Sequence, residues 1–323
     1  MTSILRPRAL QPTDTVAVAA LANELAEEEA ASFENGFATI ESLGFSVQRS
    51  PLLEPGHSRW WAVATPEETA AELNRLLRDP SVRGIFALDG GRLTVSYLDL
   101  VDTDAIRADP KPIIGLSDIS GLLLALYART GLVGIHGDVV RAFAEWPALE
   151  AGRRAELGDA YRRVLTGDGS PIPLPATDRW QCWRGGQAEG PIIGAMLNRL
   201  VRVQASGFAL APERFDGAIL FWEEAWAQSS VIWQELHALR TAGVLDRIVG
   251  MVVGAGLELQ FTPGGPANLR DIVLDVLGDR DIPVVGNVEI GHSGPNIPMP
   301  LGVRAALDAD ALTLSLIEPA VSG

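Results

Sequence analysis

The chain has 323 residues, of which 47% are hydrophobic and 21% are charged, so it can bury a substantial core and lacks the composition of a disordered protein. Its net charge of −15 argues against binding to a nucleic-acid backbone, and its single cysteine, Cys182, excludes a disulfide within the chain. We find no apolar run with the length of a signal peptide or a membrane span. We therefore expect a cytoplasmic globular protein of about two domains.

Short apolar runs alternate with helical stretches in the first half of the chain. Strands are expected at 16–21, 45–48, 84–88, 112–114 and 132–135, helices at 24–43, 66–78 and 119–129, and a helical or irregular segment at 93–101. The second helix begins with a capping box, in which Thr65 is the N-cap and Glu68 lies three residues later. Continuous apolar strands separated by helices predict a parallel sheet with helices on both faces. Ligands of such sheets bind beyond the carboxyl ends of the strands.

A proline-rich connector divides the chain. Residues 139–174 are expected to be helical and charged, and Pro171, Pro173 and Pro175 lie at their end. We predict an N-terminal domain over 1–165, a linker over 166–185 and a C-terminal domain over 186–323. In the second half we expect strands at 217–222, 248–253 and 282–290, helices at 196–201, 230–241 and 269–277, and two strands about a turn at 308–310.

Ser117 lies in a tight turn between an expected strand and a helix that ends at Gly131. A serine at this point stands on rigid support, and free N–H groups at a helix start stabilise negative charge. The turn thus has the parts of a nucleophile elbow, in which the N–H of Asp118 donates to a tetrahedral oxyanion. The structural alternative is that Ser117 or Asp118 only caps the helix.

The pair Gly90-Gly91 also follows an expected strand and should lie at the same edge of the sheet. One interpretation is a flexible turn. The other is a second oxyanion donor, because a glycine N–H can approach a ligand closely. The pair belongs to no phosphate-binding glycine motif.

Glu223 and His292 each follow an apolar run, at the turn that leaves it. A serine hydroxyl needs a base to become nucleophilic near neutral pH, and a histidine base needs a carboxylate to fix its tautomer. Ser117, Glu223 and His292 therefore form a candidate triad. The other histidines compete for the role of base: His57, His136 and His237.

These motifs resemble the LD-carboxypeptidase superfamily of serine peptidases, which includes the microcin C self-immunity peptidases. The resemblance runs from about residue 16 to the end and rests on the stretches 65–91, 110–137, 186–200, 217–225 and 282–303. It implies an N-terminal parallel-sheet α/β domain, a C-terminal domain with a small β-barrel core, and an active site at the interface of the two domains. It also implies a homodimer.

The family motifs fall on the candidate residues. The serine of the G-x-S-D turn falls on Ser117, the glutamate of the strand-end acidic pair on Glu223, and the histidine of the G-H-[ST] turn on His292. The glycine pair of the family falls on Gly90-Gly91, so the resemblance implies an oxyanion hole formed by the amides of Gly91 and Asp118.

Some positions depart from the family pattern. Met196 stands where members often have the Asn of a Gly-Gly-Asn-Leu sequence, and Asp89 stands where cell-wall carboxypeptidases usually have Arg. We expect Asp89 and Gly90 to line the substrate site, where Asp89 would repel the carboxylate of a terminal D-alanine. The microcin-immunity branch stacks a nucleobase on Trp. Trp180 or Trp183 is the candidate for that contact here, with core packing as the alternative for each.

The predicted function is therefore that of a microcin-immunity-like serine peptidase, which cleaves an acyl or peptidyl amide bond of a small peptide or an aminoacyl-nucleotide-like substrate. A murein tetrapeptide LD-carboxypeptidase that releases D-Ala is the first alternative, and a non-catalytic small-molecule-binding protein on the same scaffold is the second. We expect no nucleic-acid or membrane partner. We also expect no metal or other cofactor, because no His, Cys and carboxylate cluster has ligand spacing, and we interpret Cys182 as an ordinary cysteine.

Overall fold

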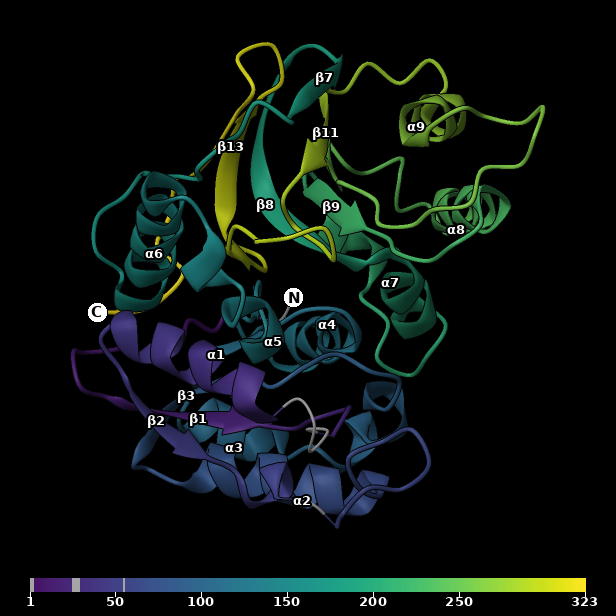
Figure 1. Cartoon of the computed structure of the whole chain (residues 1–323). Coiled ribbons are helices and arrows are strands. Elements are labelled where there is room, and N and C mark those ends of the chain that lie inside the picture. The colour runs from purple at the N-terminus through teal and green to yellow at the C-terminus, as the bar shows by residue number, and fades with distance from the viewer. Residues whose placement is uncertain (1–2, 25–29, 55) are drawn as a thin grey trace.

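Two sheets, one in each half of the chain, organise the computed structural model, which describes residues 3–24, 30–54 and 56–323 (Figure 1). The first sheet has the order β12-β5-β4-β3-β1-β2, in which β1 to β5 run parallel and β12 runs antiparallel to β5. Its strands are β1 (Thr15–Ala19), β2 (Ser46–Arg49), β3 (Val82–Ala87), β4 (Ile113–Gly115), β5 (Ile135–His136) and β12 (Met299–Pro300).

Helices cover both faces of the first sheet, as predicted. The helices of this half are α1 (Ala30–Ser42), α2 (Pro66–Arg78), α3 (Thr103–Ala108), α4 (Asp118–Thr130), α5 (Val140–Phe143) and α6 (Ala151–Thr166). Figure 1 shows α1 and α2 on opposite faces of the sheet. The capping box of α2 is confirmed, and α4 ends at Gly131 in the left-handed conformation. The segment 93–101 contains the 3-10 turns Thr94–Ser96 and Leu98–Leu100.

The second sheet has the order β6-β14-β13-β8-β9-β10-β11-β7. Its strands are β6 (Ile172–Pro173), β7 (Gln181–Arg184), β8 (Gln187–Met196), β9 (Ile219–Glu223), β10 (Gly250–Gly254), β11 (Val284–Val288), β13 (Arg304–Asp308) and β14 (Thr313–Leu316). The helices of this half are α7 (Leu197–Gln204), α8 (Ser229–Thr241) and α9 (Leu269–Leu277). The strands β8 to β11 are parallel, so their carboxyl ends meet at one edge.

Some boundaries differ from the prediction. The first helix begins at Ala30 rather than at residue 24, and residues 25–29 of the predicted range lie outside the described residues. The segment 166–185, predicted as a linker, contributes β6 and β7, the two edge strands of the second sheet. The small β-barrel core stays a prediction, because no ladder joins β6 to β7 in the described part of the chain.

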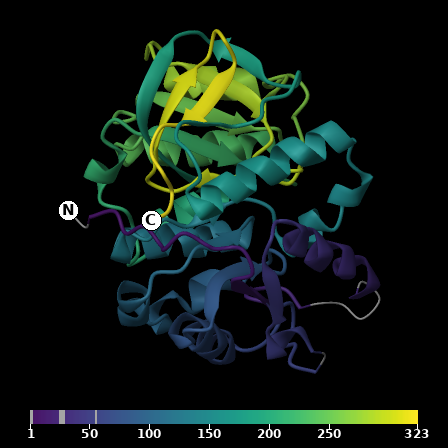
Figure 2. The same cartoon turned by 90° about the vertical axis from the view of Figure 1, so that its left-hand side faces the viewer.

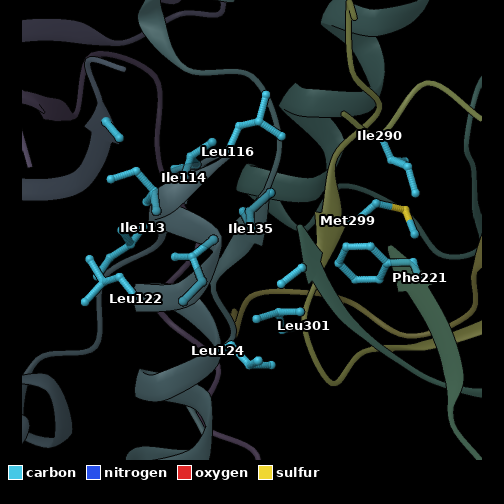
Figure 3. Packing of buried hydrophobic residues seen from close by; sticks show 14 of the residues in the cluster. Ile113, Ile114, Leu116, Leu122, Leu124, Ile135, Phe221, Ile290, Met299 and Leu301 are labelled. Carbon is cyan, nitrogen blue, oxygen red and sulfur yellow. The ribbon is translucent and has the colours of Figure 1, made fainter. Parts of the chain in front are cut away.

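One cluster of buried apolar side chains spans both sheets. Figure 3 shows Ile135 and Met299 of the first sheet on the side that faces Phe221 of the second sheet, with Leu301 between Phe221 and α4. Segments near the two ends of the chain also meet, because Arg8 and Ser322 form a β-bridge (Figure 2). The two domains therefore pack through a continuous apolar interface, which fixes the loops at its edge relative to each other.

Candidate active site

Ser117 occupies the turn between β4 and α4 in a backbone conformation that few non-glycine residues adopt. Its φ is 60° and its ψ is −123°, a combination that L-residues reach only with strain. Its side chain makes no capping bond to α4. Its carbonyl accepts hydrogen bonds from the backbone N (3.0 Å) and the hydroxyl (2.5 Å) of Ser120. The capping interpretation of Ser117 therefore fails, and its hydroxyl is left for the adjacent cleft.

Asp118 begins α4, but its carboxylate does not cap that helix. Oδ2 accepts hydrogen bonds from the backbone N of Leu93 (2.6 Å) and of Thr94 (2.8 Å), and Oδ1 forms an ion pair with Nε of Arg199 at 2.7 Å. The preceding carbonyl points into α4, so the N–H of Asp118, on the same trans peptide, faces out of the helix. That N–H has no acceptor among the described residues and is available to a ligand.

The glycine pair after β3 packs directly against the serine. A Cβ on Gly90 would lie 2.5 Å from Cβ and 2.7 Å from Oγ of Ser117, so only glycine fits. The Gly90 carbonyl accepts a hydrogen bond from the backbone N of Asn23 at 3.0 Å, and the N–H of Gly91 in the same peptide therefore points the opposite way. Within the described ranges this N–H has no acceptor either. The Ser117 hydroxyl thus lies beside two peptides with free N–H groups.

Glu223, the last residue of β9, and His292, which follows β11, form a hydrogen-bonded pair. Oε2 of the fully buried Glu223 lies 2.9 Å from Nδ1 of His292. Burial alone would lower the pKa of His292, but the charge and hydrogen bond of Glu223, with the charges of Glu224 and Asp89, raise it above its ordinary value. Pairing through Nδ1 leaves Nε2 of the neutral ring as a proton acceptor.

Ser117 and His292 line one cleft of about 1010 Å³, to which both domains contribute. Sδ of Met196 lies 4.0 Å from Oγ of Ser117. No hydrogen bond joins Ser117 to His292 in the described structure. The ring of Trp226 packs edge-on against that of His292, with the centroids 5.0 Å apart and an interplanar angle of 72°. The structure therefore brings the three predicted triad side chains to one region, with Glu223 behind His292.

The charge at the cleft is mixed, with four carboxylates and four guanidinium groups in its lining: Asp89, Glu145, Glu224, Glu235, Arg92, Arg141, Arg199 and Arg202. Asp89 lines the cleft, and its carboxylate has a cationic partner. Its carboxylate pairs with Arg141 at 2.9 Å and accepts a hydrogen bond from the N of Gly90 at 2.8 Å. Pairing with Arg141 therefore weakens the expected repulsion of a substrate carboxylate by Asp89.

The structure does not bring Trp180 or Trp183 into the cleft lining. Both are buried, and Nε1 of Trp180 donates to Oε2 of Glu289 at 2.6 Å, which is the packing alternative. Two other tryptophans line the cleft instead. Trp61 of the N-terminal domain and Trp226 of the C-terminal domain are 63% and 57% exposed. Adjacent tryptophans in a proline- and glycine-containing loop were the one signal in the sequence for Trp61.

The other histidines lie outside the lining of this cleft. His136 is fully buried, with Nε2 2.7 Å from the carbonyl of Ile290, and His237 lies within α8. Cys182 is exposed on the edge strand β7. The described residues contain no group of histidines, cysteines and carboxylates that could hold a metal ion, and no helix long and apolar enough to cross a membrane.

Sequence reasoning missed a second buried carboxylate in the cleft. Glu224 accepts hydrogen bonds from the backbone N (3.1 Å) and Nδ2 (2.9 Å) of Asn198. Burial, together with the adjacent charge of Glu223, raises the pKa of Glu224 to about 7. Glu224 therefore changes its charge near neutral pH. Because it is adjacent to Glu223, this change alters the charge around His292.

Comparison with known proteins gives the family. Residues 16–137 match the LD-carboxypeptidase N-terminal domain, and residues 189–307 match the LD-carboxypeptidase C-terminal domain. The chain belongs to the LD-carboxypeptidase family. The matched ranges of this family contain Ser117, Glu223 and His292.

The relatives of this chain include a self-immunity protein and a murein carboxypeptidase. The microcin C7 self-immunity protein MccF of Escherichia coli is 29% identical over 316 residues, which cover 90% of this chain and 89% of MccF. The murein tetrapeptide carboxypeptidase of Pseudomonas aeruginosa is 25% identical over 269 residues, covering 78% of this chain and 81% of that enzyme. A structure of MccF in complex with aspartyl sulfamoyl adenosine has a TM-score of 0.88 at 25% identity and covers 98% of this chain and all of MccF. The family fold and its two-domain arrangement are thereby established.

Proposed function

We propose that this protein is a serine peptidase or amide hydrolase of the microcin-immunity type, with Ser117 as nucleophile, His292 as general base and Glu223 as the acid that orients His292. The observation that carries the proposal is the Glu223–His292 pair, 2.9 Å between Oε2 and Nδ1, in the same region as a strained serine. The pair fixes the tautomer that accepts a proton at Nε2 and stabilises the imidazolium once it forms. Hydrogen bonds between nucleophile and base are often long in unliganded sites and tighten when substrate binds.

The proposed reaction has two halves. Oγ of Ser117 attacks the carbonyl carbon of the scissile amide while its proton passes to Nε2 of His292. The N–H groups of Gly91 and Asp118 donate to the resulting oxyanion. His292 then protonates the leaving nitrogen, and the C–N bond breaks to leave an acyl-enzyme on Ser117. Water attacks this ester, gives a proton to His292 and releases the acid, and the proton returns to Ser117.

The cleft lining favours a substrate whose leaving group contains a planar ring. Trp61 and Trp226 present exposed rings from the two domains, and such rings bind flat groups through their faces. MccF binds aspartyl sulfamoyl adenosine, an aminoacyl nucleoside with a planar base. We therefore infer that an aminoacyl-nucleotide-like compound is the better-supported substrate class, and that these two tryptophans replace Trp180 and Trp183 as candidates for the contact.

One observation favours a second candidate, a murein-type carboxypeptidase. The charge of Asp89 is compensated by Arg141, and Arg92 lines the cleft directly after the glycine pair. A guanidinium group at that position suits the free carboxylate of a terminal amino acid. Homodimer assembly and a cytoplasmic location stay predictions.

Paired hydrolysis assays test the proposal. The protein is incubated with an aminoacyl sulfamoyl adenosine or with murein tetrapeptide, and the released amino acid is measured by mass spectrometry, with Ser117→Ala as the control. Release from the nucleoside that depends on Ser117 supports the proposal, and release of D-Ala alone supports the carboxypeptidase. Binding without release from either compound, together with a Ser117 that does not react with a fluorophosphonate, would identify a binding protein instead.

A further inference from the structure

The structure assigns to Arg199 the role of a positioning residue that reaches from the C-terminal domain and holds both oxyanion-hole peptides in place. This inference rests on the proposed function, because it concerns the N–H groups of Gly91 and Asp118. Arg199 lies in the first turn of α7, and its side chain is 6% exposed. Its role is indirect. The guanidinium group contacts Gly91 and Asp118, and only the N–H groups of these two residues would contact the oxyanion.

The guanidinium group contacts three partners, one through an ion pair and two through hydrogen bonds. Nε lies 2.7 Å from Oδ1 of Asp118, Nη2 donates to the carbonyl of Gly91 at 2.9 Å, and Nη1 donates to Oδ1 of Asn198 at 2.7 Å. Two of the partners belong to the N-terminal domain and are the two residues whose amides are proposed to bind the oxyanion. One planar, rigid group therefore fixes both of them, as the fork geometry of arginine permits.

Two of the contacts of Arg199, those with Gly91 and Asp118, restrain the backbone next to a donor. The Gly91 carbonyl belongs to the peptide that follows the Gly91 N–H, and Gly91 has a φ of 148°, where a glycine is otherwise free to rotate. The Asp118 carboxylate in turn accepts hydrogen bonds from the N–H groups of Leu93 and Thr94, just after the glycine pair. Arg199, Asp118 and the segment 91–94 thus form a closed network around the site.

Arg199 also cancels a charge that would oppose catalysis. The Asp118 side chain is 3% exposed and forms its ion pair with Arg199, so it has little water to screen it. An uncompensated carboxylate at the residue that donates to the oxyanion would raise the energy of that negative charge. Removing one partner of a buried ion pair leaves the other charge uncompensated.

The third contact links this network to the acid side of the site. Asn198, which accepts from Arg199, donates through its N and Nδ2 to the carboxylate of Glu224. Glu224 is the residue after the proposed acid Glu223. The positions of oxyanion donors and triad acid are therefore coupled through two neighbouring residues of α7.

The test compares the rate constant for phosphonylation of Ser117 by a fluorophosphonate, whose transition state also places an oxygen at the oxyanion donors. Loss of one such donor costs about 100- to 1,000-fold in other serine hydrolases, so for an indirect effect we expect Arg199→Met to slow labelling by about 10- to 100-fold. Arg199→Lys should be intermediate, because one ammonium cannot serve three partners. Millimolar guanidinium ion should restore part of the rate in Arg199→Met and leave the wild type unchanged.

The control is Arg83→Met, which breaks an ion pair distant from the proposed site, Arg83–Asp109 at 3.0 Å, with side chains that are 15% and 38% exposed. It should lower the melting temperature without slowing the labelling. The double variant Asp118→Asn/Arg199→Met removes both charges, so it should melt above Arg199→Met yet label more slowly than the wild type. Wild-type labelling rates in both the single and the double variant would overturn the inference. A wild-type protein that is not labelled at all would overturn the proposed function itself.

Discussion

Oε2 of Glu223 reaches Nδ1 of His292 across the end of a strand that separates them. Glu223 ends β9 and His292 follows β11, and β10 lies between these two strands in the sheet. The contact is possible because β10 ends in Gly254. A Cβ at that position would lie 2.6 Å from Cβ of Glu223 and 3.1 Å from Cγ1 of Ile290. The pairing of acid and histidine therefore depends on the absence of a third side chain.

Gly254→Ala should separate the acid from the histidine. The added methyl group would force Glu223 or the loop before His292 to move, which lengthens the 2.9 Å contact. We expect the rate of Ser117 labelling by a fluorophosphonate to fall at least about 10-fold, in the direction of losses seen when a triad acid is removed. Gly207→Ala is the control, because a Cβ there meets nothing within 4 Å. Equal labelling of both variants would contradict this steric explanation.

Ser117→Gly should stabilise the protein while abolishing its reactivity. Ser117 holds a φ of 60° with a ψ of −123°, and such strain costs about 1–3 kcal/mol in a non-glycine residue. Glycine removes this strain, whereas Ser117→Ala keeps it and should have a free energy of unfolding close to that of the wild type. Urea denaturation should therefore place Ser117→Gly above Ser117→Ala by about 1 kcal/mol, after the entropic cost of glycine. The reverse order would show that the turn is not strained.

Glu224→Gln should move the acid limb of the labelling rate to lower pH. The charge of Glu224 is one of the contributions that raise the pKa of His292, and the rate depends on the neutral ring. Because Glu224 itself titrates at about 7, its charge is only partly present on that limb, and we expect a shift below about 1 pH unit. Rates measured from pH 5 to pH 9 test this. A limb that stays in place or moves upward would contradict the assignment.

Asp138→Asn should flatten the dependence of stability on pH. Asp138 is fully buried beside Trp146 and Asn296, and burial raises its pKa from 3.8 to about 7. The folded state therefore binds its proton more tightly than the unfolded state, and the free energy of unfolding falls as pH rises between about 4 and 7. Each such group contributes up to about 1.4 kcal/mol per pH unit. Urea titrations at several pH values should show a smaller slope for Asp138→Asn.

The exposed Asp104, whose side chain is 96% accessible, provides the comparison for that experiment. Asp104→Asn should leave the slope of the wild type in place, because this side chain is exposed and its ion pair with Arg107 lies at the surface. An unchanged slope in Asp138→Asn would mean that Asp138 stays ionised in the folded protein.

The parts of the site that follow strands could be predicted from the sequence. Ser117 leaves β4 of the first sheet, whereas Glu223 and His292 leave parallel strands of the second sheet, which bring these two positions to one edge. The elements with clear periodicity or caps, such as α2 and α4, were predictable for the same reason. These signals are local, and they need no knowledge of what packs against them.

Features that depend on distant neighbours could not be predicted. β12 has two residues and joins the first sheet although it lies near the end of the chain, so it has no local pattern. The pairing of Asp89 with Arg141 changes the charge that a substrate would meet at the cleft, and the sequence does not show this pairing. Burial likewise separated Trp180 from the cleft-lining Trp226, because a tryptophan in a short motif looks the same in a core and at a surface.

The most direct measurement is peptide mapping by mass spectrometry after reaction with a fluorophosphonate. We expect a single phosphonate on the peptide that contains Ser117, formed quickly in the wild type and at least about 1,000-fold more slowly in His292→Ala, as for other triads. The labelling rate of Glu223→Gln should lie between those of the wild type and His292→Ala. Absence of the modification at Ser117, or the same rate in His292→Ala as in the wild type, would contradict the proposal that His292 activates this serine.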